Sequence, residues 1–201
     1  MTARQKWQDA GVAEHYARGR FRSGRARGRD GRLIDSLWRR HGPREPVRTL
    51  LDLPCGTGRL ADGLRPKCER YLGADVSRAM LREGDGERLV ADAARLPFAD
   101  GSVDALVCCR LLHHLDASEL DAVCGELLRV TGSLLIASFW DAASWPALRR
   151  RWGLRRESTG RRPLATSTLE ACLRRHGGEV LGYAHSFPWL SMQTFVAVRP
   201  L

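Results

Sequence analysis

The stretch LLDLPCGTGRLADGL, residues 50–64, decides how the rest of the sequence is interpreted. Its apolar start predicts a short strand, Asp52 stands where that strand ends, and Gly-Thr-Gly leads into a helix. Glycines between a strand and a helix let the backbone approach a ligand closely, often a phosphate at the helix N-terminus. The loop could therefore hold a pyrophosphate, a triphosphate or a ligand without any phosphate.

The residues around the glycines narrow this choice of ligand. A triphosphate cradle needs Gly-Lys followed by Ser or Thr, whereas Arg-Leu follows Gly58, so this class is excluded. Residues 56–61 do fit the dinucleotide pattern G-x-G-x-x-G/A, and Asp75 ends the next predicted strand, where an acid can bind ribose hydroxyls. The carboxylate of Asp52 would repel a pyrophosphate but suits a ligand that carries an ammonium group. The motif alone indicates an adenosine-bearing ligand and leaves NAD open.

The 201 residues suffice for one α/β domain, and their charge is distributed unevenly. Residues 1–48 and 140–201 are basic, residues 49–139 are slightly acidic, and the net charge is +10. Basic flanks can bind RNA or an anionic membrane. Nearly all of this charge is arginine, however, as a codon bias would produce. A solvated surface is therefore favoured, with a nucleic-acid partner and peripheral membrane contact kept as alternatives.

The cysteines and the N-terminus bear on the location of the protein. Six cysteines occur without any C-x-x-C pair, and several lie in apolar runs, where a reduced thiol behaves as a small hydrophobe. The chain has no apolar run long enough to span a membrane, and residues 1–10 lack the apolar core of a secretory signal. These features predict a cytoplasmic protein with reduced thiols, no metal site and no transmembrane segment.

From residue 49 onward, short apolar runs alternate with amphipathic segments. Strands are predicted over residues 49–53, 70–76, 88–90, 103–109, 133–139, 179–185 and 193–198. Helices are predicted over residues 5–19, 31–41, 77–84, 115–130, 142–152 and 167–176, with an Arg/Gly-rich connector over residues 18–32. Continuous apolar strands that alternate with helices are typical of a parallel sheet covered on both faces.

Four motifs follow one another in the central part of the chain. They are Asp-Leu-Pro-Cys-Gly-Thr-Gly at 52–58, Asp-Val-Ser-x-x-Met-Leu at 75–81, Asp-Ala followed by Leu-Pro-Phe at 92–98, and Asp-Gly-Ser-Val-Asp at 100–104 leading to His-His-Leu at 113–115. In this order and spacing they resemble the class I S-adenosylmethionine-dependent methyltransferases. The resemblance is closest to the small-molecule branch that includes the ubiquinone and menaquinone methyltransferases, and it covers residues 47–140.

Two departures from the family pattern are local. Pro54 stands where the family most often has the first glycine of its loop, which is the Pro-Cys-Gly-Thr-Gly variant of the first motif. The usual Lys-Pro-Gly-Gly before the fifth strand is shortened to Val130-Thr131-Gly132, which predicts a tighter turn.

The resemblance implies a single Rossmann-like, doubly wound α/β domain with a seven-stranded, mainly parallel sheet whose last strand is antiparallel. Residues 1–46 would form an N-terminal helical, Arg-rich lid, and residues 47–201 the methyltransferase domain. Tyr16 would close over the cofactor, or else staple the first helix. The implied cofactor is S-adenosylmethionine, lying across the carboxyl ends of strands one to four.

The resemblance also assigns cofactor contacts to particular residues. Asp52 would lie near the amino group, Asp75 would bind the ribose hydroxyls, and Asp92 would accept a hydrogen bond from the adenine amine. The glycines would let the backbone approach the methionine part of the cofactor, and the backbone around Cys109 and Arg110 would form the floor of the cofactor site. The full set is Asp52, Pro54, Cys55, Gly56, Gly58, Asp75, Val76, Asp92, Ala93, Cys109 and Arg110.

His113 and His114 follow the fourth predicted strand at the mouth of this site. A base here could take a proton from an attacking hydroxyl, which makes both histidines catalytic candidates. Packing or loop support would also explain a histidine at this place, and a structural role is favoured for at least one of them.

The leading hypothesis is an enzyme that moves a methyl group from S-adenosylmethionine to an O, N or C nucleophile of a small-molecule acceptor. One alternative is an RNA methyltransferase that uses the Arg-rich flanks to bind phosphates. The others are a non-catalytic S-adenosylmethionine-binding module and an NAD-dependent dehydrogenase.

Overall fold

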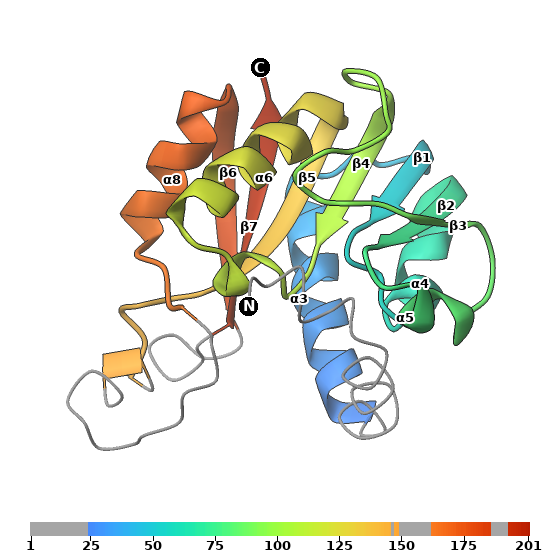
Figure 1. Ribbon diagram of the computed structural model, residues 1–201, viewed down its shortest axis with the longest axis horizontal. Coiled ribbons are helices and arrows are strands. Elements are labelled where there is room, and N and C mark those ends of the chain that lie inside the picture. The colour runs from blue at the N-terminus through green and yellow to red at the C-terminus, as the bar shows by residue number, and fades with distance from the viewer. Residues whose placement is uncertain (1–23, 146, 149–161, 186–192) are drawn as a thin grey trace.

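The computed structural model describes residues 24–145, 147–148, 162–185 and 193–201, which form an α/β fold (Figure 1). Its strands are β1 (Val47–Asp52), β2 (Cys68–Asp75), β3 (Arg88–Val90), β4 (Val103–Cys108), β5 (Thr131–Trp140), β6 (Gly178–His185) and β7 (Gln193–Pro200). Its helices are α3 (Gly24–His41), α4 (Ala61–Leu64), α5 (Arg78–Arg82), α6 (Ala117–Val130) and α8 (Thr166–Arg175), with 3-10 turns η1 (Arg65–Lys67) and η2 (Leu112–His114). All the predicted strands are present, and their bounds differ from the predictions by no more than one or two residues.

The strands form one seven-stranded sheet in the order β3-β2-β1-β4-β5-β7-β6. β7 runs antiparallel to its neighbours β5 and β6, and every other pair of adjacent strands is parallel. This confirms the predicted mainly parallel sheet with an antiparallel last strand. Because β1 lies between β2 and β4, the carboxyl ends of these three strands meet at one edge of the sheet.

Side chains alternate along the strands between two apolar layers. Leu51 lies in a cluster with residues of α6 and α8, whereas its neighbour Leu50 lies in a cluster with residues of α3 and α4. Figure 1 shows α6 and α8 side by side in front of the sheet. Cys108 and Cys109 likewise belong to opposite layers, as the two-residue period of a strand requires. Helices therefore cover both faces, as expected for a doubly wound fold.

Local sequence sets both ends of α6. Asp116 accepts a hydrogen bond from Glu119 N, and the Glu119 side chain accepts one in return from Asp116 N, both at 2.9 Å. This capping box satisfies two backbone donors at the start of the helix. α6 ends at Val130 and β5 begins at Thr131, so the turn is as tight as the sequence predicts.

The prediction for the connector over residues 18–32 is wrong in its second half, because α3 already begins at Gly24. Tertiary contacts explain the earlier start. Asp30 is buried and forms ion pairs with Arg59 and Arg110, both at 2.9 Å. An Arg/Gly-rich segment has low helix propensity, and such contacts routinely override propensity.

α3 packs on the sheet beside β6 and β7, with Ile34 and Leu37 buried in the apolar layer. The division at residue 46 between a lid and a methyltransferase domain stays a prediction. The predicted helix over residues 5–19 lies outside the described residues, and so does most of the one over residues 142–152. Among the residues that the structure describes, no helix combines the length and the apolar character needed to cross a membrane.

Replacing Leu37 by alanine tests whether α3 is part of the folded domain. Leu37 is fully buried, so Leu37→Ala should lower the free energy of unfolding by about 2–5 kcal/mol, as at other buried leucines. Leu33→Ala is the matched control, because Leu33 lies on the same helix but is only partly buried and should cost less. Urea unfolding followed by circular dichroism measures both. Unchanged stability of Leu37→Ala would show that α3 is a detachable segment.

Candidate functional site

A cavity of about 220 Å³ lies at the carboxyl edge of the sheet, beside the end of β1. Four residues of the predicted cofactor set line it, namely Pro54 after β1, Val76 after β2, and Asp92 and Ala93 after β3. Most of the remaining wall is apolar and comes from Leu53, Ala91, Ala94, Leu111, Leu115 and Val123. The fold thus brings residues from three strand ends together around one apolar cavity.

Asp92 and Glu119 are the acidic residues on this wall. Glu119 takes part in the N-terminal cap of α6. Asp92 Oδ1 accepts a hydrogen bond from Ala94 N at 3.1 Å, which fixes the carboxylate beside the cavity. Because a carboxylate has about four acceptor positions, Asp92 can also accept a hydrogen bond from an amine in the cavity.

Asp75 joins the end of β2 to the glycine loop. Its carboxylate accepts hydrogen bonds from Gly56 N and Ser77 N, both at 2.9 Å. Burial raises the pKa of Asp75, and the backbone donors, of which Ser77 N has the larger effect, oppose that rise. Asp75 therefore has a structural role in addition to the one predicted toward ribose hydroxyls.

Asp52 is a buried carboxyl with incomplete hydrogen bonding. Tyr71 Oη donates a hydrogen bond to Asp52 Oδ2 at 2.8 Å, while Oδ1 has no hydrogen-bond partner among the described residues. Burial raises the pKa of Asp52 from 3.8 to about 7, although the Tyr71 hydroxyl and the charge of Arg59 act in the opposite direction. The carboxyl therefore stands ready to pair with a cationic ligand group.

The two glycines of the loop serve different needs. Both have positive φ angles, 56° at Gly56 and 83° at Gly58, which residues with a Cβ rarely adopt. A Cβ on Gly56 would meet nothing within 4 Å, whereas a Cβ on Gly58 would come 2.3 Å from Arg88 Nη2. Gly56 therefore leaves open space beside the loop, and Gly58 makes room for an arginine side chain.

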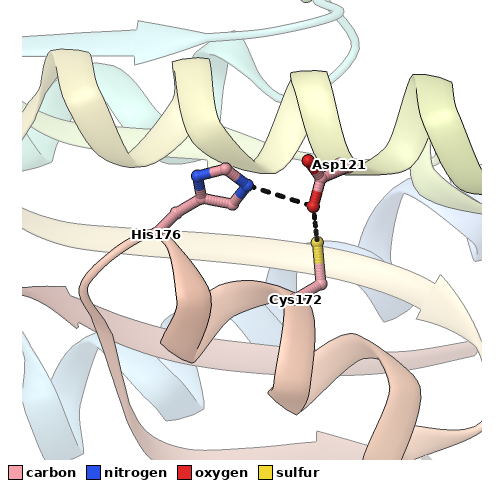
Figure 2. A group of neighbouring side chains, drawn as sticks. All are labelled: Asp121, Cys172 and His176. Atoms are coloured by element: carbon pink, nitrogen blue, oxygen red, sulfur yellow. Dashed lines mark hydrogen bonds and ion pairs between the residues drawn. The ribbon is translucent and has the colours of Figure 1, made fainter.

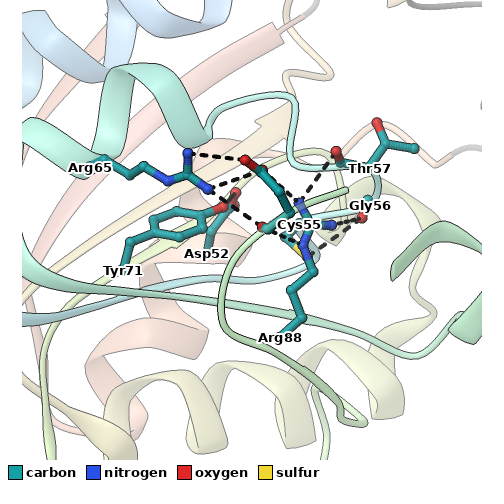
Figure 3. Close-up of polar contacts among 8 residues, drawn as sticks. Asp52, Cys55, Gly56, Thr57, Arg65, Tyr71 and Arg88 are labelled. Atoms are coloured by element: carbon teal, nitrogen blue, oxygen red, sulfur yellow. Dashed lines mark hydrogen bonds and ion pairs between the residues drawn. The ribbon is translucent and has the colours of Figure 1, made fainter. Parts of the chain in front are cut away.

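Arg88 holds the glycine loop from the start of β3, as Figure 3 shows. Its Nη1 donates to Gly56 O at 3.2 Å, and its Nε donates to Asp85 O at 2.9 Å. The side chain is only 7% exposed. Neither Arg88 nor Tyr71 was expected at this site, and no local pattern connects them to the loop. In the structure Gly84, like Gly58, lacks room for a Cβ beside this guanidinium.

Cys55, Cys109 and Arg110 lie near the loop but do not line the cavity. The Cys55 thiol packs on Gly73, where a Cβ would come 3.0 Å from Sγ. Arg110 has a φ of 68°, and its N–H donates to Ser138 Oγ at 2.8 Å. Burial raises the pKa of both cysteine thiols, so neither has the character of a reactive thiolate.

A buried charge cluster ties α3 to the glycine loop and to the end of β4. Asp30 Oδ2 lies 2.9 Å from Arg59 Nη1 and 2.9 Å from Arg110 Nε. Asp30 is 1% exposed. The sequence did not predict this cluster, because its members come from three distant segments.

The two histidines differ in their surroundings. His113 is buried, and its ring stacks on Trp140 with a centroid distance of 4.6 Å and an interplanar angle of 8°. Its carbonyl also accepts a hydrogen bond from Arg162 N at 2.7 Å. The ring of His114 lies 4.4 Å from that of His113 and is less buried. These contacts favour a supporting role for His113. Tyr16 lies outside the described residues.

Comparison with known proteins gives a match over the part of the chain that contains this site. Residues 51–136 match the family model described as a methyltransferase domain. A demethylmenaquinone methyltransferase of Beutenbergia cavernae is 38% identical over 119 residues, which are 53% of this chain and 48% of that protein. A tRNA (carboxymethyluridine(34)-5-O)-methyltransferase of Arabidopsis thaliana is 33% identical over 99 residues, 46% of this chain and 24% of that protein. The chain therefore spans about half or less of the length of these relatives.

The fold is similar to that of solved methyltransferases. The magnesium protoporphyrin IX methyltransferase of Synechocystis PCC 6803, solved with bound SAH, superposes with a TM-score of 0.76. The match covers 98% of each chain at 18% sequence identity, so it shows the fold alone.

The contact between Arg88 and Gly58 predicts coupled effects on stability. Gly58→Ala adds a Cβ at a left-handed φ and displaces the guanidinium, so it should destabilise the fold by about 1–3 kcal/mol. In an Arg88→Ala background the same change should cost less, and a double-mutant cycle in urea should show a coupling of about 0.5–3 kcal/mol. Gly177→Ala is the control, because Gly177 also has a positive φ, its Cβ would meet nothing within 4 Å, and Arg88 makes no contact with it, so its cost should be equal in both backgrounds. Strict additivity of Gly58→Ala and Arg88→Ala would contradict the contact.

Asp52→Asn should remove a pH-dependent destabilisation. Because the pKa of Asp52 is raised from 3.8 to about 7 on folding, the folded protein keeps a proton that the unfolded chain loses between about pH 4 and pH 7. The free energy of unfolding of the parent should fall as pH rises through this range, by about 4 kcal/mol from this group. The variant should lack that decrease. Urea unfolding at several pH values measures both proteins, and parallel profiles would show that Asp52 ionises normally.

Proposed function

We propose that this chain, a class I S-adenosylmethionine-dependent methyltransferase by its domain match and its fold, transfers a methyl group to a small-molecule acceptor. One observation carries the proposal. Pro54, Val76, Asp92 and Ala93 converge from three strand ends on one cavity at the carboxyl edge of the sheet. Open α/β sheets bind ligands at this edge, at the point where the strand order reverses. Here the order reverses between β1 and β4.

The described residues fit the adenosine part of S-adenosylmethionine. The apolar wall, with Val76 and Leu111, suits a planar base, and Asp92 supplies an acceptor for its exocyclic amine. Asp75, at the end of the neighbouring strand, is the proposed acceptor for the ribose hydroxyls. The volume of about 220 Å³ is below the roughly 300–1,000 Å³ of pockets that enclose a whole ligand. The cavity thus suits the base rather than the entire cofactor.

The methionine part of the cofactor carries an ammonium group, and Asp52 is its proposed partner. Asp52 Oδ1 is buried without a hydrogen-bond partner in the described part of the chain. A nearby cation favours the ionised carboxylate and lowers its pKa. Gly56 leaves open space at the turn that follows Asp52.

S-adenosylmethionine supplies a methyl group that its sulfonium already activates. The task of the protein is then to hold the acceptor nucleophile in line and to exclude water. We propose His114 as the proton acceptor where the nucleophile must lose a proton. His113, stacked on Trp140, would fix the position of η2 and therefore of His114.

A small molecule is favoured over RNA because nine arginines of the described segments, six of them in the central part of the chain, pair with carboxylates of the protein itself. Such ion pairs involve Arg59, Arg65, Arg70, Arg88, Arg110, Arg129, Arg174, Arg175 and Arg199. A guanidinium engaged with a carboxylate must give up that partner before it binds a phosphate. We also propose a cytoplasmic location, since all six cysteines are free thiols and a reducing compartment preserves them.

Calorimetry with S-adenosylhomocysteine tests the cofactor assignment. Binding in the micromolar range, about −8 kcal/mol, is expected, with no comparable binding of NAD. Asp92→Asn should weaken binding by about 1–3 kcal/mol, because an amide nitrogen would then face the adenine amine. Glu179→Gln, exposed on β6, is the control and should bind like the parent. Tight binding of NAD without binding of S-adenosylhomocysteine would refute the assignment.

A second assay distinguishes the two acceptor classes. It measures the release of S-adenosylhomocysteine by the protein with small molecules and, in parallel, with tRNA. Demethylmenaquinone, the acceptor in the name of the Beutenbergia relative, belongs in the small-molecule panel. We expect S-adenosylhomocysteine to be released with a small-molecule acceptor, and we expect this release not to depend on the salt concentration. Release only with tRNA, with an affinity that falls steeply as salt increases, would instead favour RNA.

A further inference from the structure

Away from the cofactor cavity, three side chains with metal-ligating atoms meet between two helices (Figure 2). Asp121 lies on α6, Cys172 lies on α8, and His176 caps the C-terminal end of α8. Asp121 Oδ1 is 3.2 Å from His176 Nε2 and 3.7 Å from Cys172 Sγ. One ligand atom from each residue can be chosen so that all three lie within 4.8 Å of one another.

We propose that Asp121, Cys172 and His176 bind a zinc ion that links α6 to α8. A thiolate, an imidazole and a carboxylate are all ligands that zinc accepts, at bond lengths of about 2.0–2.3 Å. In a tetrahedral site with such bonds, neighbouring ligand atoms lie about 3.3–3.8 Å apart. The two distances from Asp121 Oδ1 are already close to this range. Only the thiol and the imidazole need to approach each other, and a rotation of the partly exposed His176 side chain can bring its ring toward the buried Cys172 thiol.

The surroundings of the three residues also indicate a missing partner. His176 Nε2 is buried and has no aligned hydrogen-bond partner among the described residues, although it lies at ion-pair distance from Asp121. The Cys172 thiol lies 4.0 Å from Leu120 O as well as 3.7 Å from Asp121 Oδ1, so both contacts direct it toward α6, as supporting groups orient metal ligands. Asp121 and His176 line a surface hollow of about 930 Å³, so water can reach a fourth coordination position.

The sequence predicted no metal site, and the fold shows why it gave no signal. Cys172 and His176 are four residues apart, so they lie on the same side of α8. The third residue, Asp121, belongs to a different helix far earlier in the chain. Only the packing of α6 on α8 brings it to the other two.

Arg175 allows a metal site to be distinguished from a plain ion-pair network. Its Nη1 lies 2.6 Å from Asp121 Oδ1, and its side chain is 64% exposed. Without a metal ion, Arg175 neutralises Asp121. A zinc ion must therefore compete with Arg175 for the carboxylate, and removal of the guanidinium should strengthen zinc binding.

The proposal is tested by titrating the tag-free, reduced chain of 201 residues with Zn²⁺ and with Co²⁺. One equivalent of Zn²⁺ should bind with a Kd of about 1 µM or below and should raise the melting temperature by mass action. Co²⁺ should give the absorption of a tetrahedral ion with a thiolate charge-transfer band. Neither measurement depends on methyl transfer, so failure here leaves the proposed function untouched.

Single variants identify the ligands. We expect Zn²⁺ binding to weaken by about 100-fold in each of the variants Asp121→Asn, Cys172→Ser and His176→Gln. Such a loss is the upper end of the effect on metal affinity when a group that only supports a metal ligand is removed. Cys68→Ser and His185→Gln are matched controls away from the cluster and should bind like the parent. Arg175→Ala, at an exposed position where folding is not at risk, should bind Zn²⁺ more tightly than the parent.

Two results would overturn the proposal. One is the absence of saturable one-to-one binding of Zn²⁺ by the folded parent protein. The other is binding that survives Cys172→Ser and His176→Gln and is unchanged or weakened by Arg175→Ala. The second result would mean that Asp121, Arg175 and His176 form an ion-pair network only.

Discussion

The chain that leaves β1 continues to pair with both neighbouring strands, and the geometry of the site depends on this pairing. Leu53 N donates to Val107 O of β4 at 3.0 Å, and Cys55 N donates to Ala74 O of β2 at 2.8 Å. Gly56 N is then held by the Asp75 carboxylate at 2.9 Å. The segment is thus held by β4 at Leu53 and by β2 at Cys55 before it turns. This is why Pro54 reaches the cavity in one defined position.

The same burial places two carboxyl groups in an environment that disfavours their charge. Asp75 is compensated by two backbone donors, whereas Asp52 receives one hydrogen bond, from Tyr71. A buried carboxyl with an unpaired oxygen destabilises the fold. Groups of this kind concentrate where a ligand provides the missing interaction. The contrast between the two acids therefore supports a ligand role for Asp52, and gives Asp75 an architectural role beside the one proposed toward the ribose hydroxyls.

The sequence predicted the features that depend on neighbours in the chain. Buried parallel strands are continuous apolar runs, so β1, β4 and β5 were recognisable, and Asp92 could be placed at a strand end. It did not predict Arg88, which fills the space beside a glycine of a distant segment, or Asp30, whose two arginine partners lie after β1 and β4. The early start of α3 was missed for the same reason. These features follow from contacts between segments that only the folded sheet brings together.

The two proposed sites share one helix. Val123 of α6 lines the cofactor cavity, while Asp121, two residues earlier, points toward α8. Residues two apart on a helix do not face each other, so a single helix can present one to each site. α6 is also fixed at its start by the cap of Asp116 and at its end by the immediate entry into β5. An ion that joined α6 to α8 would therefore restrain the helix between these fixed ends, and with it the wall of the cavity.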